Sequence, residues 1–436
     1  MTQVNLRELV LSMLLSVTRD QAYSHVVLKD VLDNYQYLSK QERSYLTRVF
    51  QGTLEHMIWI DHVLNQFSSV KTGKMKPVIR TILRFSVYEL QFMDAIPPRA
   101  TCNEAVKLAQ KKGFGNLKGF VNGVLRNISR ELSHISLPGR EEGEAEYLSL
   151  RYSMPMWIVK EWLGQYPVGQ VEEMLASFLQ EAPTSIRVNT SRISRDELIR
   201  RLAEEGIAAK PHGELPDGLF ISGYDYLEAL ETFQEGLFYV QDVSSMRAAH
   251  CCQVQQGDTV LDVCAAPGGK SIHLAELLSG TGMVEARDLT GFKVGMIREN
   301  IKRSRLTNIK AVVKDARVFY PEDEASADVV LADLPCSGLG VIGKKPDIKY
   351  HMTQEKIGQL VALQREILHM VWRYVKPGGT FVYSTCTISR QENQENVSWF
   401  LREHPDSCLL EQHQYLPLEG EQDGFFLAKL IKENYE

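Results

Sequence analysis

The chain has 436 residues, of which 44% are hydrophobic and 24% charged; this is the composition of a globular protein, and the length exceeds one ordinary domain core. No apolar run approaches the ~18 residues that span a bilayer, and the N-terminus has neither a basic region nor a small-residue cleavage site, so we expect a cytoplasmic protein without a membrane partner. The seven cysteines form no C-x-x-C pair, which argues against a metal site and against a disulfide framework.

Charge is distributed unevenly along the chain. The net charge is −6, but residues 1–135 carry 18 Lys and Arg against 11 Asp and Glu, a net of +7. The remainder carries 31 against 44, a net of −13. This asymmetry indicates a nucleic-acid-binding face on the N-terminal part, and the alternative is an ordinary solvated basic surface.

Residues 1–138 are predicted to form an all-α domain. Apolar residues recur three and four positions apart over 6–17, 46–54 and 79–90, as on the buried face of a helix. A further predicted helix over 104–112 carries Lys107, Lys111 and Lys112. The order of the helices and the stretch FVNGVLRNI (120–128) resemble the helical domain of the antitermination factor NusB, an RNA-binding fold.

Two further domains follow a linker rich in Pro, Gly and Glu at 136–146. Residues 147–238 mix strand-like and helical patterns, and we expect a small α+β connector there. Residues 239–436 alternate strands with amphipathic helices, which predicts a Rossmann-like α/β domain with a mostly parallel sheet and helices on both faces. The predicted strands are 259–263, 283–288, 309–314, 328–333 and 380–385, with 424–432 as an antiparallel edge strand.

The stretch TVLDVCAAPGGKS (259–271) is typical of a strand, a tight glycine loop and a helix. Gly268 and Gly269 lack a Cβ, so a ligand can lie against the backbone, and the amides of the helix start point into the same space. The stretch therefore predicts a site for a nucleotide-like ligand at the carboxyl end of a strand. The alternative is a plain turn between strand and helix.

Acidic residues stand at the ends of two further predicted strands. Asp288 lies 20 residues after Gly268, a spacing at which a carboxylate accepts hydrogen bonds from the hydroxyls of a ribose. Its alternative role is a helix N-cap. Asp315 ends the next strand, from which it could reach an adenine amino group; the alternative is a capped loop.

Two cysteines follow strands of the same predicted sheet. Cys336 follows Asp333, which ends a buried strand where a carboxyl group requires a partner or a ligand. Cys386 ends the strand over 380–385. A single cysteine is more often a buried apolar residue, but two at one sheet edge, beside an acid and a glycine loop, indicate nucleophilic chemistry.

A basic loop follows Cys336. It contains Lys344, Lys345 and Lys349, and lysines beside an active crevice suit contacts with a phosphate backbone. The alternative is a solubilising surface.

The motifs CAAPGGK, DLPCSG and STCT, in this order, resemble the RNA 5-methylcytosine methyltransferases that use S-adenosylmethionine. With the NusB-like domain and the connector, the layout resembles the bacterial 16S ribosomal RNA cytosine-5 methyltransferases of the Fmu/Sun type over nearly the whole chain. The sequence departs from the family pattern at Leu334, where Ala is usual, and at Lys344 and Lys345, where Arg is common.

The resemblance implies roles for individual residues. Cys386, in the TC motif, is the expected nucleophile, and Cys336, in the PC motif, is expected to help release the product. The cofactor S-adenosylmethionine is expected to contact Cys264, Ala265, Ala266, Pro267, Gly268, Gly269, Lys270, Asp288, Asp315 and Asp333. The expected partner is 16S ribosomal RNA or an early small-subunit particle, bound by a monomer that needs no metal.

The expected reaction begins with attack of the Cys386 thiolate on C6 of cytosine, which makes C5 nucleophilic. Asp333, with a pKa raised by burial, is expected to protonate N3, and Lys270 to orient these groups. Three alternatives stay open: a non-catalytic RNA-binding assembly factor, a methyltransferase of another RNA such as tRNA, and a dinucleotide-dependent oxidoreductase. The glycine loop lacks the G-x-G-x-x-G spacing of the last class.

Overall fold

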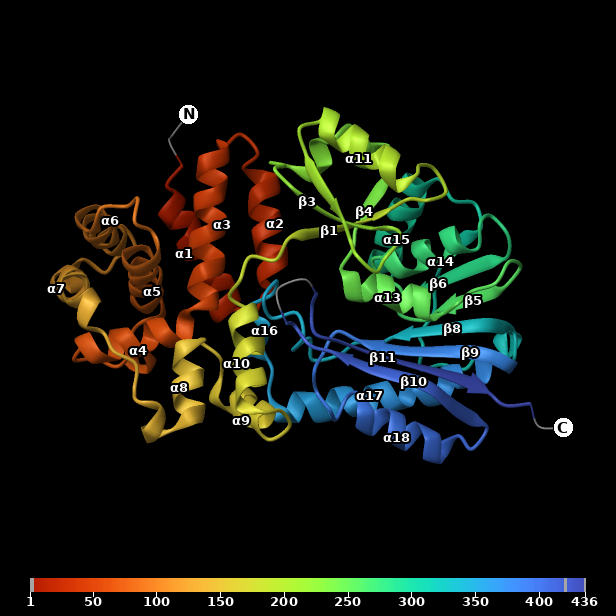
Figure 1. Cartoon of the computed structure of the whole chain (residues 1–436). Helices are drawn as coiled ribbons and strands as arrows, with labels where there is room; N and C mark the ends of the chain where they lie inside the picture. Colours follow the sequence, from red (N-terminus) through yellow and green to blue (C-terminus); the bar gives the residue numbers. More distant parts are fainter. Residues whose placement is uncertain (1–3, 419–421, 435–436) are drawn as a thin grey trace. The chain divides into compact units, whose positions relative to one another are not determined.

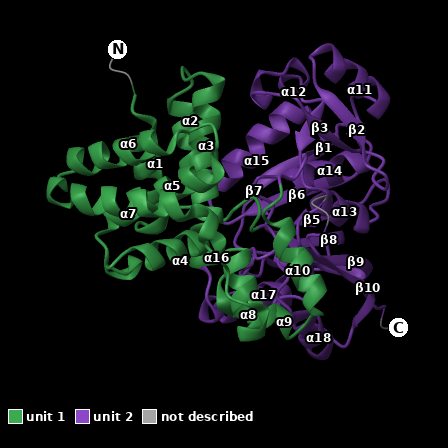
Figure 2. Ribbon diagram, turned by 60° about the vertical axis from the view of Figure 1, so that its left-hand side comes forward, with its two compact units in different colours: residues 1–180, 342–351 green, residues 181–341, 352–436 purple. Residues whose placement is uncertain are grey.

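The computed structural model describes residues 4–418 and 422–434. The chain forms two compact units, one of residues 1–180 with 342–351 and one of residues 181–341 with 352–436 (Figure 2). None of the helices in these described ranges combines the length and the apolar composition that crossing a membrane requires. The two units divide the chain at other points than the three domains predicted from the sequence, whose bounds therefore remain a proposal.

The first unit is helical, as predicted. Its core is formed by apolar faces of α1, α3, α4, α5, α6 and α7, with α5 contributing residues such as Ile82 and Leu83 that are fully buried. Ser39 begins α3 through a capping box with Glu42, which satisfies free amides at the helix start. The α-helices are α1 (Leu6–Thr18), α2 (Ser24–Asn34), α3 (Lys40–Glu55), α4 (Met57–Phe67), α5 (Pro77–Phe92), α6 (Pro98–Lys111), α7 (Lys118–Glu131), α8 (Glu144–Arg151), α9 (Met156–Leu163), α10 (Val168–Ser177) and α16 (Ile348–His351).

Residues 342–351, which we call the returning segment, belong to this helical unit although they follow the DLPCSG motif in the chain. The carboxylate of Asp347, 1% exposed, accepts a hydrogen bond from the hydroxyl of Ser24. Lys349, 2% exposed, donates to the carbonyl of Glu55 at 2.7 Å. The returning segment is therefore built into the interior of the helical unit.

The second unit begins with a four-stranded antiparallel sheet in the order β2-β3-β1-β4, which confirms the expected α+β connector. Its apolar core includes Ile186, Leu198 and Phe238. Ser194 caps α11 by accepting from the amide of Glu197, as the sequence predicts. The elements are β1 (Thr184–Val188), α11 (Arg195–Glu204), β2 (Ala208–Pro211), β3 (Gly218–Ser222), α12 (Glu231–Gln234), β4 (Phe238–Val240) and α13 (Val243–Cys251).

The same unit contains a seven-stranded sheet in the order β10-β11-β9-β8-β5-β6-β7 (Figure 1). The strands β5 to β9 are parallel, and β11 and β10 are antiparallel additions. Its elements are β5 (Thr259–Asp262), α14 (Gly269–Leu277), β6 (Met283–Asp288), α15 (Gly291–Ser304), β7 (Ile309–Val313), β8 (Ala327–Asp333), α17 (Gln354–Val371), β9 (Val375–Thr385), α18 (Gln394–Glu403), β10 (Ser407–Tyr415) and β11 (Phe425–Lys432).

Both faces of this sheet are covered by helices (Figure 1). Along β8, Val329 and Leu331 pack in one core with α14 and α15, while Val330 and Ala332 pack in the other with α17 and α18. Burial on both faces explains why the strand is a nearly continuous apolar run. The strand order reverses between β5 and β8, and in open α/β sheets ligands bind at such a switch point.

The antiparallel strand predicted at 424–432 is present as β11, but its predicted place at the edge of the sheet is wrong. The observed strand, β11, pairs with β9 on one side and with β10 on the other, so β10 is the edge. The sequence SCLLEQHQY of β10 was not predicted as a strand because most of it is exposed or half-exposed and polar, which weakens the alternating pattern on which strand prediction depends.

Candidate active site

The sheet register brings the two motif cysteines together. Asp333 of β8 pairs with Ser384 of β9, so the turns that follow these strands leave the sheet side by side. The Sγ atoms of Cys336 and Cys386 lie 3.2 Å apart, and both cysteines are partly buried and outside any disulfide. Two cysteines 50 positions apart in the chain thus form one thiol pair.

The environment distinguishes the two thiols. The hydrogen bond with Cys386, together with burial, raises the pKa of Cys336 well above its ordinary value, because the proton of Cys336 is held between the two sulfurs. A charge on Cys386 is also one of the interactions that raise the pKa of Lys270. Loss of the Cys336 proton is therefore disfavoured, and the Lys270 ammonium is close enough to interact with a charge on Cys386.

Lys270 and Asp333 form an ion pair beside the thiols. The Lys270 ammonium lies 2.7 Å from the Asp333 carboxylate, whose other oxygen accepts from the Ser384 hydroxyl at 2.7 Å. Burial lowers the pKa of Lys270, but the charge of Asp333 and this hydrogen bond outweigh burial and raise it. The sequence led us to expect a buried Asp333 that has a partner or a ligand; the structure supplies Lys270 as the partner and leaves the Asp333 side chain 27% exposed.

The glycine loop adopts the predicted conformation between β5 and α14. Gly268 has a φ of +103°, and a Cβ there would lie 3.1 Å from the side chain of Ile297. Glycine is thus required by the left-handed backbone and by packing against α15. The sequence suggested instead that Gly268 leaves room for a ligand, and Gly268 lines neither of the two cavities described below.

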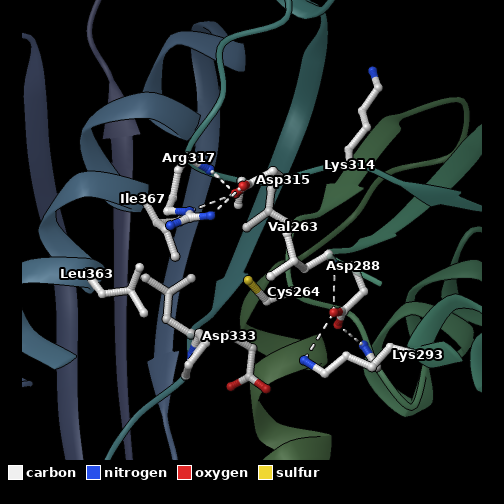
Figure 3. Close-up of a pocket in the computed structure, with 15 residues that line it drawn as sticks. Val263, Cys264, Asp288, Lys293, Lys314, Asp315, Arg317, Asp333, Leu363 and Ile367 are labelled. Atoms are coloured by element: carbon white, nitrogen blue, oxygen red, sulfur yellow. Dashed lines mark hydrogen bonds and ion pairs between the residues drawn. The ribbon is translucent and has the colours of Figure 1, made fainter. Parts of the chain in front are cut away.

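A cavity of about 390 Å³ lies beside this loop at the carboxyl ends of β5, β6, β7 and β8 (Figure 3). The volume is in the range of small-ligand sites. Apolar side chains of Val263, Leu363 and Ile367 line it together with the carboxylates of Asp288, Asp315 and Asp333, and the other lining residues are Cys264, Ala266, Leu289, Lys293, Lys314, Ala316, Arg317, Leu334 and Pro335.

Asp288 joins the glycine loop to the end of β6. Its carboxylate accepts from the amides of Ala266 at 3.0 Å and Leu289 at 2.8 Å, and it lies 3.1 Å from the ammonium of Lys293 (Figure 3). The residue is 4% exposed. Asp288 therefore fixes the loop and borders the cavity at the same time.

Asp315 stands at the end of β7 and is held by Arg317. The Arg317 side chain donates to both carboxylate oxygens, at 3.0 and 2.7 Å (Figure 3), and this hydrogen bonding is the main reason that the pKa of Asp315 is lowered. The amide of Asp315 donates to the hydroxyl of Tyr320 at 3.2 Å.

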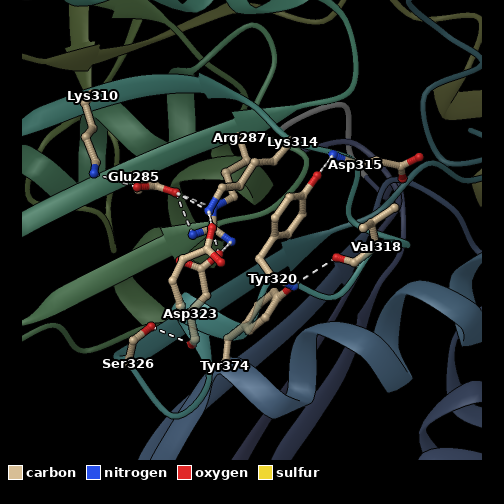
Figure 4. A network of polar contacts seen from close by, with 11 residues as sticks. Glu285, Arg287, Lys310, Lys314, Asp315, Val318, Tyr320, Asp323, Ser326 and Tyr374 are labelled. Carbon is tan, nitrogen blue, oxygen red and sulfur yellow. Dashed lines mark hydrogen bonds and ion pairs between the residues drawn. The ribbon is translucent and has the colours of Figure 1, made fainter.

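A network of charged residues lies behind Tyr320 (Figure 4). The Arg287 guanidinium contacts both Glu285, at 2.5 Å, and Asp323, at 3.0 Å, and Lys314 donates to Asp323 at 2.6 Å. These side chains come from β6, from the end of β7 and from the following loop. The network anchors the loop whose tyrosine holds the backbone of Asp315.

A smaller cavity of about 190 Å³ adjoins the ion pair and shares Cys264, Ala266 and Asp333 with the larger one. It is also lined by Ala265, Pro267, Gly269 and Lys270, all predicted site residues, and by Val240, Gln241, Asp242, Ser245 and Asp262, which the sequence did not single out. In the sequence, Gln241 and Asp242 form a polar pair directly after a strand. Such a pair does not stand out there, because it is equally typical of the boundary predicted between two domains. Burial raises the pKa of Asp262 to about 7.

In the basic loop after Cys336, the structure contradicts the predicted role of one of the three lysines, Lys349. Lys349 was expected to face RNA phosphates, but it is buried and donates to a backbone carbonyl within the helical unit. Burial lowers its pKa to about 7. Lys344 is exposed and Lys345 half-exposed, so a role in phosphate contact remains a prediction for these two.

One group of side chains in the described ranges could share a metal ion, formed by Asp217, His250 and His273. The Asp217 carboxylate lies 2.9 Å from Nε2 of His250 and 2.7 Å from Nε2 of His273, which are hydrogen-bonding distances. The group connects β3 and α13 to α14. These contacts hold the helix that follows the glycine loop.

Comparison with known proteins places this site in a family. A family model described as 16S rRNA methyltransferase RsmB/F matches residues 249–431, a NusB family model matches residues 4–130, and a model of the ferredoxin-like domain of RsmF/B-like methyltransferases matches residues 154–224. The probable ribosomal RNA small subunit methyltransferase B of Bacillus subtilis is 37% identical over 99% of this chain and 100% of its own length. Its counterpart in Sodalis glossinidius is 34% identical over 91% of each chain.

Solved structures agree. The crystal structure of PH0851 has a TM-score of 0.83 and 28% identity and covers 99% of both chains. That of NSun6 from Pyrococcus horikoshii with SFG has a TM-score of 0.58 and 25% identity, over 63% of this chain and 97% of that one.

The second unit therefore contains the Rossmann-like domain of the S-adenosylmethionine-dependent methyltransferases, preceded by a ferredoxin-like connector and a NusB-like domain. Within that class, the chain belongs to the ribosomal RNA small subunit methyltransferase B family.

Proposed function

We propose that this protein transfers a methyl group from S-adenosylmethionine to C5 of a cytosine in 16S ribosomal RNA through a covalent bond between Cys386 and C6. The observation that carries the proposal is the thiol pair, with 3.2 Å between its sulfurs, next to the Lys270–Asp333 ion pair and the two cavities. The names of the relatives support a small-subunit ribosomal RNA as the substrate.

The larger cavity fits the adenosine part of S-adenosylmethionine. The apolar side chains of Val263, Leu363 and Ile367 offer walls for an adenine ring, and the Asp288 carboxylate accepts from ribose hydroxyls. The smaller cavity, beside Lys270, suits the amino acid end. NSun6, a neighbour in structure, was solved with SFG, an analogue of this cofactor, and the bound cofactor supplies an electrophilic methyl group.

Cys386 attacks C6, which breaks the aromaticity of the ring and gives C5 the character of an enamine carbon. The thiolate needed for attack is stabilised by the Cys336 proton and the nearby Lys270 ammonium. After methyl transfer, a solvent water takes the C5 proton, the electron pair of that C–H bond re-forms C5=C6, and the C6–S bond breaks to release the Cys386 thiolate. The hydrogen bond from Cys336 then stabilises Cys386 as the leaving group, which accounts for the expected role of Cys336 in product release.

The Lys270–Asp333 pair supplies a proton near the ring nitrogen. Asp333 was expected to donate from a raised pKa, but its partner Lys270 carries the proton that the pair shares. In the proposal, the proton moves from Lys270 to Asp333 and from Asp333 to the cytosine N3 as Cys386 attacks C6, and the other oxygen of Asp333 accepts from the exocyclic amine. The cytosine must be unpaired or turned out of its helix to reach these groups.

Bisulfite sequencing of 16S ribosomal RNA tests the proposed reaction, because 5-methylcytosine resists conversion. A strain lacking the gene is expected to lose one protected cytosine, and the unsubstituted gene, but not Cys386→Ala, is expected to restore it. An unchanged pattern of protected cytosines in the deletion strain would contradict the assignment to this RNA.

A further inference from the structure

Two adjacent buried residues hold the turns that carry the two thiols. Glu392 and Asn393 stand just before α18, and both are 0% exposed. The side chain of Glu392 bonds to the turn that contains Cys336. That of Asn393 bonds to the turn that contains Cys386 and also donates to the side chain of Gln414 at 2.8 Å.

Glu392 holds the turn of Cys336 from both sides. Its carboxylate accepts from the amide of Ser337 at 2.8 Å and from the Ser337 hydroxyl at 2.5 Å. The side chain of Gln364 donates to the same carboxylate at 3.0 Å and to the carbonyl of Pro335 at 2.9 Å. Ser337, which follows Cys336, is thus bonded directly to the Glu392 carboxylate, and Pro335, which precedes Cys336, is connected to it through Gln364.

Asn393 holds the turn of Cys386 in the same way. Its side-chain oxygen accepts from the hydroxyl of Thr385 at 2.6 Å, and its side-chain nitrogen donates to the carbonyl of Thr387 at 3.0 Å. These are the residues directly before and after Cys386. The Thr387 hydroxyl also lies 2.7 Å from that of Ser337, which links the two turns directly.

We propose that Glu392 and Asn393 are positioning residues that set the separation of the Cys336 and Cys386 sulfurs. This inference rests on the proposed function, because the separation of the two sulfurs matters only if Cys336 and Cys386 act together in the reaction. Because the two residues are joined by one peptide bond, neither turn can move relative to the other without breaking a hydrogen bond or bending this segment. A buried carboxylate that loses its partners is costly, so the arrangement resists displacement.

The proposal is tested without methylation by cross-linking the thiols with diamide. Diamide takes one hydrogen from each thiol, an S–S bond forms, and the reagent becomes a hydrazine. The rate of the Cys336–Cys386 cross-link, followed by peptide mass spectrometry, reports how often the sulfurs meet. Glu392→Ala and Asn393→Ala are expected to slow it about tenfold or more, since displacements near 1 Å strongly reduce such encounter rates.

Two isosteric variants give opposite expectations. In Glu392→Gln, the side-chain oxygen still accepts from Ser337 and Gln364, and the new amide nitrogen donates to the Ser337 hydroxyl. The cross-linking rate is therefore expected to stay near that of the unsubstituted protein. In Asn393→Asp, a carboxylate faces the Thr387 carbonyl without a donor, so the rate is expected to fall. If the two residues only stabilised the fold, the cross-linking rates of these two variants would not differ in this way while their affinity for the cofactor stayed unchanged.

Calorimetry with S-adenosylmethionine serves as the control for folding, because neither residue lines the cavities. If an alanine variant does not fold, Gln364→Ala replaces it with the same expected slowing, because this change removes the donor to the Pro335 carbonyl and one donor to the Glu392 carboxylate. Unchanged cross-linking in the folded variants, or no cross-link in the unsubstituted protein, would overturn the positioning role. A slowed cross-link in a protein that methylates no RNA would support the positioning role while contradicting the proposed function.

Discussion

Lys270 connects the two chemical parts of the candidate site. Its ammonium pairs with Asp333 at 2.7 Å and responds to charge on Cys386, so it balances an acid and a thiolate together. The side chain also lines the smaller cavity.

At the same scale, Asp288 is expected to contribute directly to cofactor affinity. Asp288→Ala removes the acceptor for the ribose hydroxyls and the hydrogen bond to Ala266, and hydrogen bonds to charged groups contribute about 1.5–3 kcal/mol, so S-adenosylmethionine binding should weaken about tenfold or more. Lys293→Ala, which leaves the carboxylate in place, is the matched control and should change affinity little. Equal affinities of the two variants in calorimetry would move the ribose contact elsewhere.

Helix α14 is the element on which the site depends, because one end follows the glycine loop and its far face is tied to the connector. On that face Glu276 pairs with Arg187 of β1, and both side chains are essentially unexposed, at 1% and 0%. His273 contacts Asp217 one turn earlier. The connector therefore has a structural role in fixing the cofactor loop.

Breaking one partner of that buried pair is expected to destabilise the second unit strongly. Arg187→Met leaves the Glu276 carboxyl group buried without its partner, a change that costs about 3–5 kcal/mol in comparable sites. The double variant Arg187→Met with Glu276→Leu should recover much of this loss because no charge remains buried. Urea unfolding measures both, and a double variant as unstable as the single one would argue against the electrostatic explanation.

The returning segment offers a pH-dependent prediction. Lys349 has a pKa lowered by burial to about 7, whereas an unfolded lysine titrates near ~10.4. Between these values the unfolded state binds more protons, so the free energy of unfolding should rise with pH by up to about 1.4 kcal/mol per unit. Lys349→Met lacks this contribution.

The difference in unfolding free energy between the unsubstituted protein and Lys349→Met, measured at pH 7.5 and 9.5, isolates this lysine. The difference should shift in favour of the unsubstituted protein at the higher pH. A difference that does not change with pH would mean that Lys349 keeps its proton inside the helical unit.

Over the whole molecule, the sequence predicted site residues best where a recognisable motif directly follows a predicted strand. The glycine loop, Asp288 and both cysteines were predictable because parallel strands end at one edge of a sheet. The anchors Glu392 and Asn393 were not, since a polar run before a helix has the same pattern whether it is buried or solvated. The burial of Lys349 was not predictable either, because it depends on a partner, Glu55, almost 300 positions earlier in the chain.

The basic N-terminal unit is expected to bind RNA through exposed lysines of α6 and its end. Lys111 and Lys112 lie 2.5 and 2.6 Å from Glu8, and Lys107 lies 2.8 Å from Glu104. Reversing the charge of these three lysines should weaken RNA binding and reduce its salt dependence without changing cofactor affinity.

Glu8→Gln is the informative counterpart, because it frees Lys111 and Lys112 from their ion pairs and should strengthen RNA binding. Filter binding at several salt concentrations measures both variants. If neither substitution alters RNA affinity, this face is only a solvated surface.

The covalent mechanism is tested most directly by a denaturing gel of each cysteine variant with RNA and labelled cofactor. Cys386→Ala should give neither methylation nor a protein–RNA adduct, because C5 is never activated. Cys336→Ala should methylate the RNA and then remain attached to it, because Cys386 loses the hydrogen bond that makes it a good leaving group. A stable adduct in Cys386→Ala and none in Cys336→Ala would reverse the roles, and full activity without adducts in both would contradict the mechanism.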